Sequence, residues 1–352
     1  MKKIKAVVVT DGFLLSEYAK TAHGLIRGSN RFEILAVIDS KNAGVITSEI
    51  LKDAHVDIPV VSSIDEATIK FENIECLIVG VATVGGILSA TLREEIKKAI
   101  TYKINIVNGL HDQLRHQDDI VALASKHQIE LTDIRGPKPI KDLHFWTGQI
   151  FDVDVPIIAV LGMDCALGKR TTTRLITEAF SKIGIHAEMI YTGQTGWMQG
   201  SKYGFIFDST LNDFVSGELE HAIVNCWKEA KPDVIFLEGQ SGLRNPSGPC
   251  GLEFLISGCA KQVILVHAPN KKYYDNQQKW GEIYSIESEI EIIEKFGSKV
   301  IGVALNTQGL TLNESKNLQN QLEDKLYIPV ILPLEEGVEK LIPVIKSLLN
   351  EN

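Results

Sequence analysis

Apolar and polar positions along the chain predict strands and helices that alternate one by one. Before residue 140, short Val- and Ile-rich runs are separated by longer stretches in which apolar residues recur at helical spacing. The predicted strands are residues 5–10, 34–39, 76–81, 104–108 and 129–132, and the predicted helices are 15–26, 48–54, 88–102 and 118–127. Because one helix separates each pair of strands, this region is predicted to form a parallel sheet with helices on both faces.

The same alternation resumes after residue 156. The predicted strands are residues 157–161, 187–191, 234–238, 263–267, 300–306 and 328–332, and helices are predicted near 171–183, 215–230, 285–296, 313–322 and 338–349. Between the two regions the sequence RGPKP interrupts both patterns, since each proline favours extended backbone before it. The chain is therefore predicted to be an α/β protein with two parallel-sheet domains.

Composition and charge exclude several classes of protein. The net charge of −9 argues against nucleic acid or an anionic membrane as the main partner. No apolar stretch reaches the roughly 18 residues of a membrane span. The apolar run after MKKIK is a first strand and not a signal peptide. The five cysteines are odd in number and lack paired spacing, which indicates a reduced, cytoplasmic protein without disulfides or structural zinc.

One stretch carries a specific chemical pattern, IIAVLGMDCALGKRTTTRLI, which begins at Ile157. An apolar strand ends at Gly162, and Gly168-Lys169 opens a helix with hydroxyl side chains in its first turn. Strand, glycine-bounded loop, lysine and helix are typical of a phosphate-binding loop, in which backbone N–H groups and the helix N-terminus face the anion. We expect Lys169 to be exposed and to bind phosphate oxygens as a point charge.

The spacing of this loop departs from the usual pattern. Five residues separate the glycines instead of four, and Arg170 stands where a magnesium-binding hydroxyl is expected. Thr171 or Thr172 offers a hydroxyl one or two positions later. The pattern therefore predicts phosphate binding more strongly than Mg²⁺ binding, and no metal site is predicted. A glycine-rich turn without a ligand is the alternative interpretation.

These patterns predict the domain organisation. Residues 1–140 form a Rossmann-like N-terminal domain, residues 141–155 a connector, and residues 156–352 a P-loop NTPase-like domain. The first domain lacks the G-x-G-x-x-G spacing of nicotinamide-binding proteins. Asp39, at the end of the second predicted strand, is therefore interpreted as a turn residue and not as a ribose ligand.

Candidate site residues stand at the carboxyl ends of the predicted strands, where ligands of open α/β sheets bind. Glu238 occupies the Walker-B position, and His267 ends the next strand, where a neighbouring imidazole could exchange protons with it. Backbone N–H groups near Gly239 or Gly193 are candidates for an oxyanion hole. We predict Glu238 and His267 as catalytic residues, Gly162, Asp164, Gly168, Lys169, Arg170, Thr171, Thr172 and Asn306 as cofactor-binding residues, and Gln194, Thr195, Gln240, Ser241, Arg135 and His111 as substrate-binding residues. Surface turns and helix caps are the alternatives for the isolated polar residues.

The loop GMDCALGKRTT is similar to GTDCAVGKMTT, the signature of the D-glutamate N-acetyltransferase (DgcN)-like family, formerly a domain-of-unknown-function family. The resemblance continues in TGQTG, NDFVSGELE, LEGQSGLRNP, His267 and VIGVALNTQGL, and in KNAGV, NGLHD and DIRGPKP of the first domain. It covers essentially the whole chain. Met163, Leu167, Arg170 and Ser241 depart from the family pattern.

The resemblance implies acetyl transfer from acetyl-CoA to the amine of a small, D-glutamate-like amino acid, with the loop holding coenzyme phosphates. A base must deprotonate the amine, and Glu238 and His267 are the candidates. A more distant resemblance to dethiobiotin synthetase implies the alternative, a ligase that uses ATP with Mg²⁺ to activate a carboxylate. A nucleotide-binding regulatory module is a third class. A small-molecule substrate and a homo-oligomeric state are expected.

Overall fold

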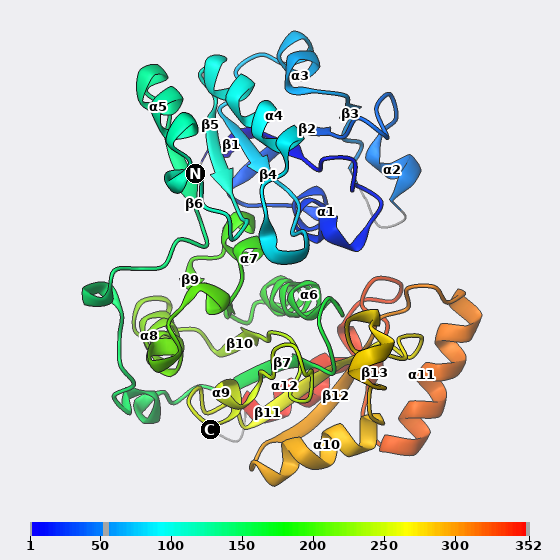
Figure 1. The fold of residues 1–352 in the computed structure, drawn as a ribbon. Coiled ribbons are helices and arrows are strands. Elements are labelled where there is room, and N and C mark those ends of the chain that lie inside the picture. The colour runs from blue at the N-terminus through cyan, green and yellow to red at the C-terminus, as the bar shows by residue number, and fades with distance from the viewer. Residues whose placement is uncertain (1, 52–55, 350–352) are drawn as a thin grey trace. The chain divides into compact units, whose positions relative to one another are not determined.

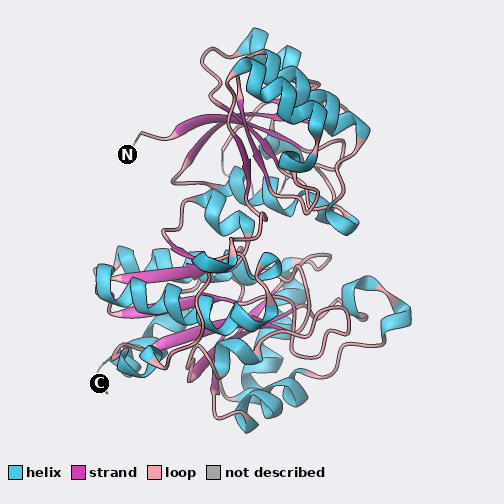
Figure 2. Ribbon diagram, turned by 60° about the vertical axis from the view of Figure 1, so that its left-hand side comes forward, coloured by secondary structure: helices cyan, strands magenta, loops and turns pink. Residues whose placement is uncertain are grey.

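The Val- and Ile-rich runs form the strands of two separate parallel sheets in the computed structural model, which describes residues 2–51 and 56–349 (Figures 1 and 2). Each sheet belongs to its own unit of the chain. The first unit contains Met1–Pro137 and Gln194–Ser201, and the second contains Lys138–Gly193 and Lys202–Asn352. The predicted fold class, two parallel-sheet α/β domains, is confirmed.

The first unit contains a sheet of order β3-β2-β1-β4-β5-β6, in which every pair of neighbours is parallel. Its strands are β1 (Ile4–Val9), β2 (Phe32–Ile38), β3 (Val60–Val61), β4 (Cys76–Val79), β5 (Asn105–Asn108) and β6 (Leu131–Asp133), and its helices from the same part of the sequence are α1 (Lys20–Arg27), α2 (Thr47–Ile50), α3 (Ile64–Lys70), α4 (Ala90–Thr101) and α5 (Asp118–His127). Consecutive residues of β1 are buried, which is why the strand lacks polar alternation. The helix predicted over 48–54 extends past α2 into residues 52–55, which lie outside the described residues.

The second unit contains a sheet of order β13-β12-β11-β7-β10-β8-β9, again with parallel neighbours. Its strands are β7 (Ile157–Gly162), β8 (Ala187–Tyr191), β9 (Tyr203–Gly204), β10 (Val234–Glu238), β11 (Gln262–His267), β12 (Lys299–Leu305) and β13 (Val330–Ile331), and its helices are α6 (Lys169–Lys182), α8 (Asn212–Ala230), α9 (Leu252–Leu255), α10 (Ile286–Lys295), α11 (Leu312–Leu326) and α12 (Ile342–Leu349). The two-residue strands β3 and β9 are too short to produce a sequence pattern. Among the described residues, no helix is long and apolar enough to cross a membrane.

One helix from the second half of the sequence packs with the first unit. Helix α7 (Gln194–Gln199) lies beside α1, as Figure 1 shows. The amide of Gln199 donates to Gly24 O at 2.7 Å, and the hydroxyl of Ser29 donates to Met198 O at 2.8 Å. The first unit is therefore completed by residues distant in sequence, which local patterning does not reveal.

The connector at the start of the second unit is packed on α8. The hydroxyl of Thr147 donates to the buried carboxylate of Glu220 at 2.9 Å, and the backbone of residues 144 and 145 passes directly over Gly217. A Cβ at Gly217 would lie 2.0 Å from His144 O and 2.4 Å from Phe145 C. Only glycine therefore allows the connector to approach the helix this closely.

We predict that Gly217→Ala destabilises the protein by about 1–3 kcal/mol, because the added methyl group displaces backbone and not a movable side chain. Urea denaturation followed by circular dichroism measures the loss. Asn212→Ala is the matched control, because Asn212 is an exposed residue of the same helix. Its effect should stay within about 0.5 kcal/mol. Equal denaturation midpoints for Gly217→Ala and the wild type would contradict the prediction.

Candidate phosphate-binding site

The candidate site is built around the loop between β7 and α6. Strand β7 is buried along its whole length, at an inner position of the sheet between β11 and β10. After Gly162 the chain turns through Ala166 and Gly168, which have positive φ angles of 56° and 99°. It enters the fourteen-residue helix α6 at Lys169. The loop thus places the N-terminal amides of a long helix at the carboxyl edge of the sheet, an arrangement that binds phosphate.

Lys169 is folded against this loop. A Cβ at Gly162 would lie 3.0 Å from Lys169 Cδ, so the glycine leaves room for the lysine stem. The ammonium group donates to the carbonyl oxygens of Asp164 at 2.6 Å and Ser241 at 2.7 Å. Because Lys169 is only 6% exposed, the expectation of an exposed lysine is wrong. A phosphate bound by this ammonium group would compete with these carbonyl oxygens.

Asp164 has a fully buried carboxylate at the start of the loop. Its Oδ1 accepts a hydrogen bond from Asn245 Nδ2 at 2.5 Å, and its Oδ2 accepts one from the backbone N–H of Asp275 at 2.9 Å. Oδ2 also forms an ion pair with Lys271 Nζ at 2.6 Å. Lys271 in turn donates to Cys165 O at 3.3 Å. In the structure Asp164 therefore binds the chain itself and fixes the shape of the loop.

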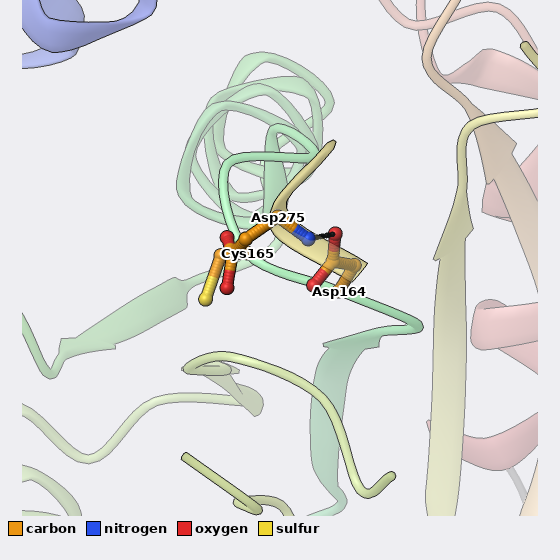
Figure 3. Close-up of side chains that lie close together, drawn as sticks. All are labelled: Asp164, Cys165 and Asp275. Atoms are coloured by element: carbon orange, nitrogen blue, oxygen red, sulfur yellow. Dashed lines mark hydrogen bonds between the residues drawn. The ribbon is translucent and has the colours of Figure 1, made fainter. Parts of the chain in front are cut away.

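Three potential metal ligands lie close together here, as Figure 3 shows. Asp164, Cys165 and Asp275 each offer one ligand atom, and these atoms lie within 4.8 Å of one another. Lys271 already neutralises the Asp164 carboxylate. Burial raises the pKa of the Cys165 thiol, so the helix end does not produce a reactive thiolate there. These contacts give the group little affinity for a cation, and the absence of a metal site stays a prediction.

The first turn of α6 carries the hydroxyls of Thr171 and Thr172, which are predicted to bind the cofactor. The backbone N–H of Thr172 donates to Gly168 O at 2.9 Å, and the hydroxyl of Thr173 donates to Lys169 O at 2.8 Å. The helix is therefore regular from its start. One residue rotates a helix by about 100°, so Thr171 faces a different direction from the position after the lysine, which Arg170 occupies.

Glu238 ends β10, the strand beside β7, and is buried. Its Oε2 accepts a hydrogen bond from the backbone N–H of Thr192 at 3.1 Å, and the Thr192 hydroxyl donates to Glu238 O at 2.6 Å. Gly193 lies next to this carboxylate, since a Cβ there would lie 3.8 Å from Glu238 Oε1 and 3.3 Å from Gln240 Nε2. The N–H of Gly239 itself donates to Val160 O within the sheet, and an oxyanion hole formed by N–H groups near Gly239 or Gly193 stays a prediction.

His267 ends β11, on the other side of β7. Two strand spacings, about 10 Å, separate the strands of His267 and Glu238. Burial lowers the pKa of His267 to about 4, against the opposing effect of the Glu287 charge, so the imidazole is neutral at pH 7. Its Nδ1 is buried and has no hydrogen-bond partner among the described residues. The structure therefore does not bring the two predicted catalytic residues into contact.

Three other predicted residues hold the site together through their own bonds. Gln240 Nε2 donates to the Thr192 hydroxyl at 2.8 Å, and Ser241 accepts from Cys165 Sγ at 3.3 Å. Asn306, at the end of β12, donates through Nδ2 to Leu167 O at 3.0 Å. These side chains lie around the phosphate loop, and Asn306 binds its backbone directly.

The predicted substrate-binding residues Gln194 and Thr195 lie on α7, within the first unit. The hydroxyl of Thr195 lies 3.0 Å from that of Thr21 on α1, and Gln194 Nε2 donates to the same hydroxyl at 3.5 Å. Both residues are buried. Their described hydrogen bonds hold α7 against α1 and give no sign of a substrate contact.

The remaining predicted residues also belong to the first unit. Arg135 is buried and donates through Nη1 to Gly109 O at 2.6 Å, whereas His111 is exposed. Asp39 accepts hydrogen bonds from the Thr10 hydroxyl and the Leu14 N–H, which fixes the turn after β1, as expected for a turn residue.

Asn245, Lys271 and Asp275 complete the network around Asp164 and were not predicted as site residues from the sequence. Asn245 is fully buried, and its amide also donates to Asp275 Oδ2 at 3.0 Å. The signal that the sequence offered was the long polar segment after Gly242. A simple connection along the surface does not need a buried amide, so such a segment indicates polar side chains that bind elsewhere in the protein. The contact itself depends on two loops separated by about eighty residues in sequence.

Two family models match this chain. The P-loop domain of DUF1611, described as a domain of unknown function, matches residues 144–342, and its Rossmann-like N-terminal domain matches residues 40–137. A crystal structure of a DUF1611 family protein from Anabaena variabilis superimposes with a TM-score of 0.90 at 25% identity, and the match covers 98% of this chain and 100% of that one.

Curated relatives extend this comparison. A D-glutamate N-acetyltransferase from Pseudoalteromonas sp is 28% identical over 272 residues, which cover 75% of this chain and 79% of the relative. A D-glutamate N-acetyltransferase from Tritonibacter scottomollicae is 25% identical over 288 residues, which cover 79% and 83%. Together with the family models, this similarity establishes that the chain belongs to the DUF1611 family, with a Rossmann-like N-terminal domain and a P-loop C-terminal domain.

Proposed function

We propose that this protein is an N-acetyltransferase that moves an acetyl group from acetyl-CoA to the amine of a small, D-glutamate-like amino acid. The observation that carries the proposal is the similarity to two curated D-glutamate N-acetyltransferases over at least three quarters of the chain. The geometry of the phosphate loop supports it. A fold alone does not determine a reaction, so the proposed roles depend on particular residues.

The loop residues are suited to the phosphates of coenzyme A. Lys169 and Arg170 open α6, where the helix N-terminus also favours an anion. Arg170 can pair with a phosphate but cannot bind a cation. A phosphate-binding role without nucleotide cleavage requires no Mg²⁺ at this position. Acetyl-CoA would supply an acyl group already activated as a thioester.

Glu238 is the candidate base. An amino acid amine is mostly protonated at pH 7 and must lose a proton before it attacks a carbonyl carbon. Glu238 lies at the carboxyl end of β10 with its Oε2 oriented by the Thr192 N–H, and Gly193 lies beside Oε1. His267 is assigned no direct part in this proton transfer, because β7 separates its strand from that of Glu238.

We predict that Lys169→Ala weakens acetyl-CoA binding by about tenfold to a hundredfold, the usual effect of losing a charged hydrogen bond. Isothermal titration calorimetry measures the affinity. Lys182→Ala, at the exposed end of the same helix, is the matched control and should bind normally. The Lys169 variant should also lose some thermal stability, because the carbonyl oxygens of Asp164 and Ser241 lose their donor. Unchanged affinity in a folded Lys169 variant would remove the loop from the proposal.

We predict that Glu238→Gln lowers kcat by about 10²- to 10⁴-fold and leaves acetyl-CoA affinity within about twofold, because glutamine keeps the shape but is not a base. The assay measures acetylation of D-glutamate, with L-glutamate and other amino acids as comparisons. Glu291→Gln, an exposed residue of α10, is the matched control.

The same assay separates transfer from ligation. The proposed activity should persist in EDTA and without ATP, because the position after Lys169 offers no cation ligand. Turnover that requires both ATP and Mg²⁺ would instead support the carboxylate-activating ligase.

A further inference from the structure

The connector and the segment after α9 present a group of exposed apolar side chains, here called the aromatic face: Phe145, Trp146, Phe151 and Ile256. Phe145 is the sequence neighbour of Trp146 and packs against Phe214 of α8. The rings of Trp146 and Phe151 meet edge to face at 5.6 Å between centroids, and Trp146 Nε1 donates to Ser257 O at 3.1 Å, beside Ile256. Figure 1 shows the connector passing α8 and α9 within the second unit.

Two buried carboxylates hold the connector in this position. Glu218 accepts hydrogen bonds from the backbone N–H of His144 at 3.0 Å and from Lys138 Nζ at 2.5 Å. Glu220 accepts from the backbone N–H groups of Thr147 at 2.6 Å and Ile150 at 3.2 Å. Hydrogen bonds to buried carboxylates are expected of a segment that is held in one conformation, and not of a solvated linker. The aromatic side chains are therefore held in place with their apolar surface facing solvent.

The exposed area is large for a connector. Phe151 is 72% exposed, Phe145 63%, Ile256 57% and Trp146 40%. Together these side chains expose on the order of 400 Å² of apolar surface, about half of what one partner contributes to a standard protein interface. An apolar centre of this size with a polar rim matches the anatomy of a protein interface.

Charges around the aromatic face favour a second copy of this chain as the occupant. Lys141 and Asp152 are exposed residues of the connector itself. Asp213 precedes Phe214, whose ring packs on Phe145, and Lys228 donates to Gln149 of the connector, so both signs lie beside the face. In a two-fold interface each copy presents the same patch, and a lysine of one copy can meet an aspartate of the other. An anionic lipid surface would find no excess of positive charge there, and the whole chain carries −9.

We propose that the aromatic face is the contact surface of a homodimer related by a two-fold axis. This proposal does not depend on the enzymatic activity. Sedimentation equilibrium of the full-length protein, from about 1 to about 100 µM, measures the association. The wild type should have twice the mass of one chain at the upper end of this range.

Two variants from different segments test the surface. Phe151→Glu and Ile256→Glu each add a carboxylate to the proposed contact surface. In the dimer this carboxylate would face either the same carboxylate of the second copy or its apolar surface. Each variant should therefore weaken dimerisation by about a hundredfold or more. Both residues are mostly exposed, so the chain should fold, and circular dichroism and the thermal midpoint verify this. Tyr327→Glu, at a 91% exposed position of the same unit, is the matched control and should remain dimeric.

Each remaining outcome overturns the proposal. A wild type that is monomeric throughout the concentration range excludes a homodimer and leaves a different protein as the partner of the face. Folded Phe151→Glu and Ile256→Glu variants that remain dimeric place the dimer contact elsewhere. Dissociation of Tyr327→Glu to the same extent shows that added charge, and not the aromatic face, controls association.

Discussion

The ammonium group of Lys169 joins the two loops on which the candidate site depends. It donates to Asp164 O, in the loop after β7, and to Ser241 O, in the segment after β10. Adjacent parallel strands bring these loops to the same edge of the sheet, because the carboxyl ends of the strands coincide there. One buried cation therefore fixes the relation between the phosphate loop and the strand end that carries Glu238. A phosphate bound to this lysine would affect the hydrogen bonds that the lysine makes to both loops.

Buried charges recur in the second unit, and several of them are bonded by the chain itself. Around the loop, Asp164 is neutralised by Lys271 and hydrogen-bonded by Asn245. On α8, Glu218 and Glu220 bind the connector. Removing one partner of such a group leaves a buried charge unpaired, which costs several kcal/mol. These networks are therefore sensitive to substitution, and they hold irregular segments in single conformations.

The order of strands in the sheet determines which of the polar residues at the strand ends lie close enough to act together. Glu238 and His267 end strands that are consecutive in the sequence. In the sheet, however, these strands lie on opposite sides of β7, which separates the two residues. Burial further lowers the pKa of His267 to about 4 and keeps its imidazole neutral. Glu238, whose Oε2 accepts a hydrogen bond from the Thr192 N–H, is the candidate base of the proposed function.

The sequence by itself determined the fold class, most of the strands and helices, and the phosphate loop. Those features depend on local patterns: buried parallel strands are continuous apolar runs, and a glycine-bounded turn before Lys169 is readable without any distant residue. Only the tertiary structure decided that Lys169 is buried, that α7 completes the first unit, and that Asn245 binds Asp164. Each depends on segments far apart in the chain, and side-chain burial and hydrogen-bond partners are set by what the fold brings next to a residue, which its own sequence neighbours do not specify.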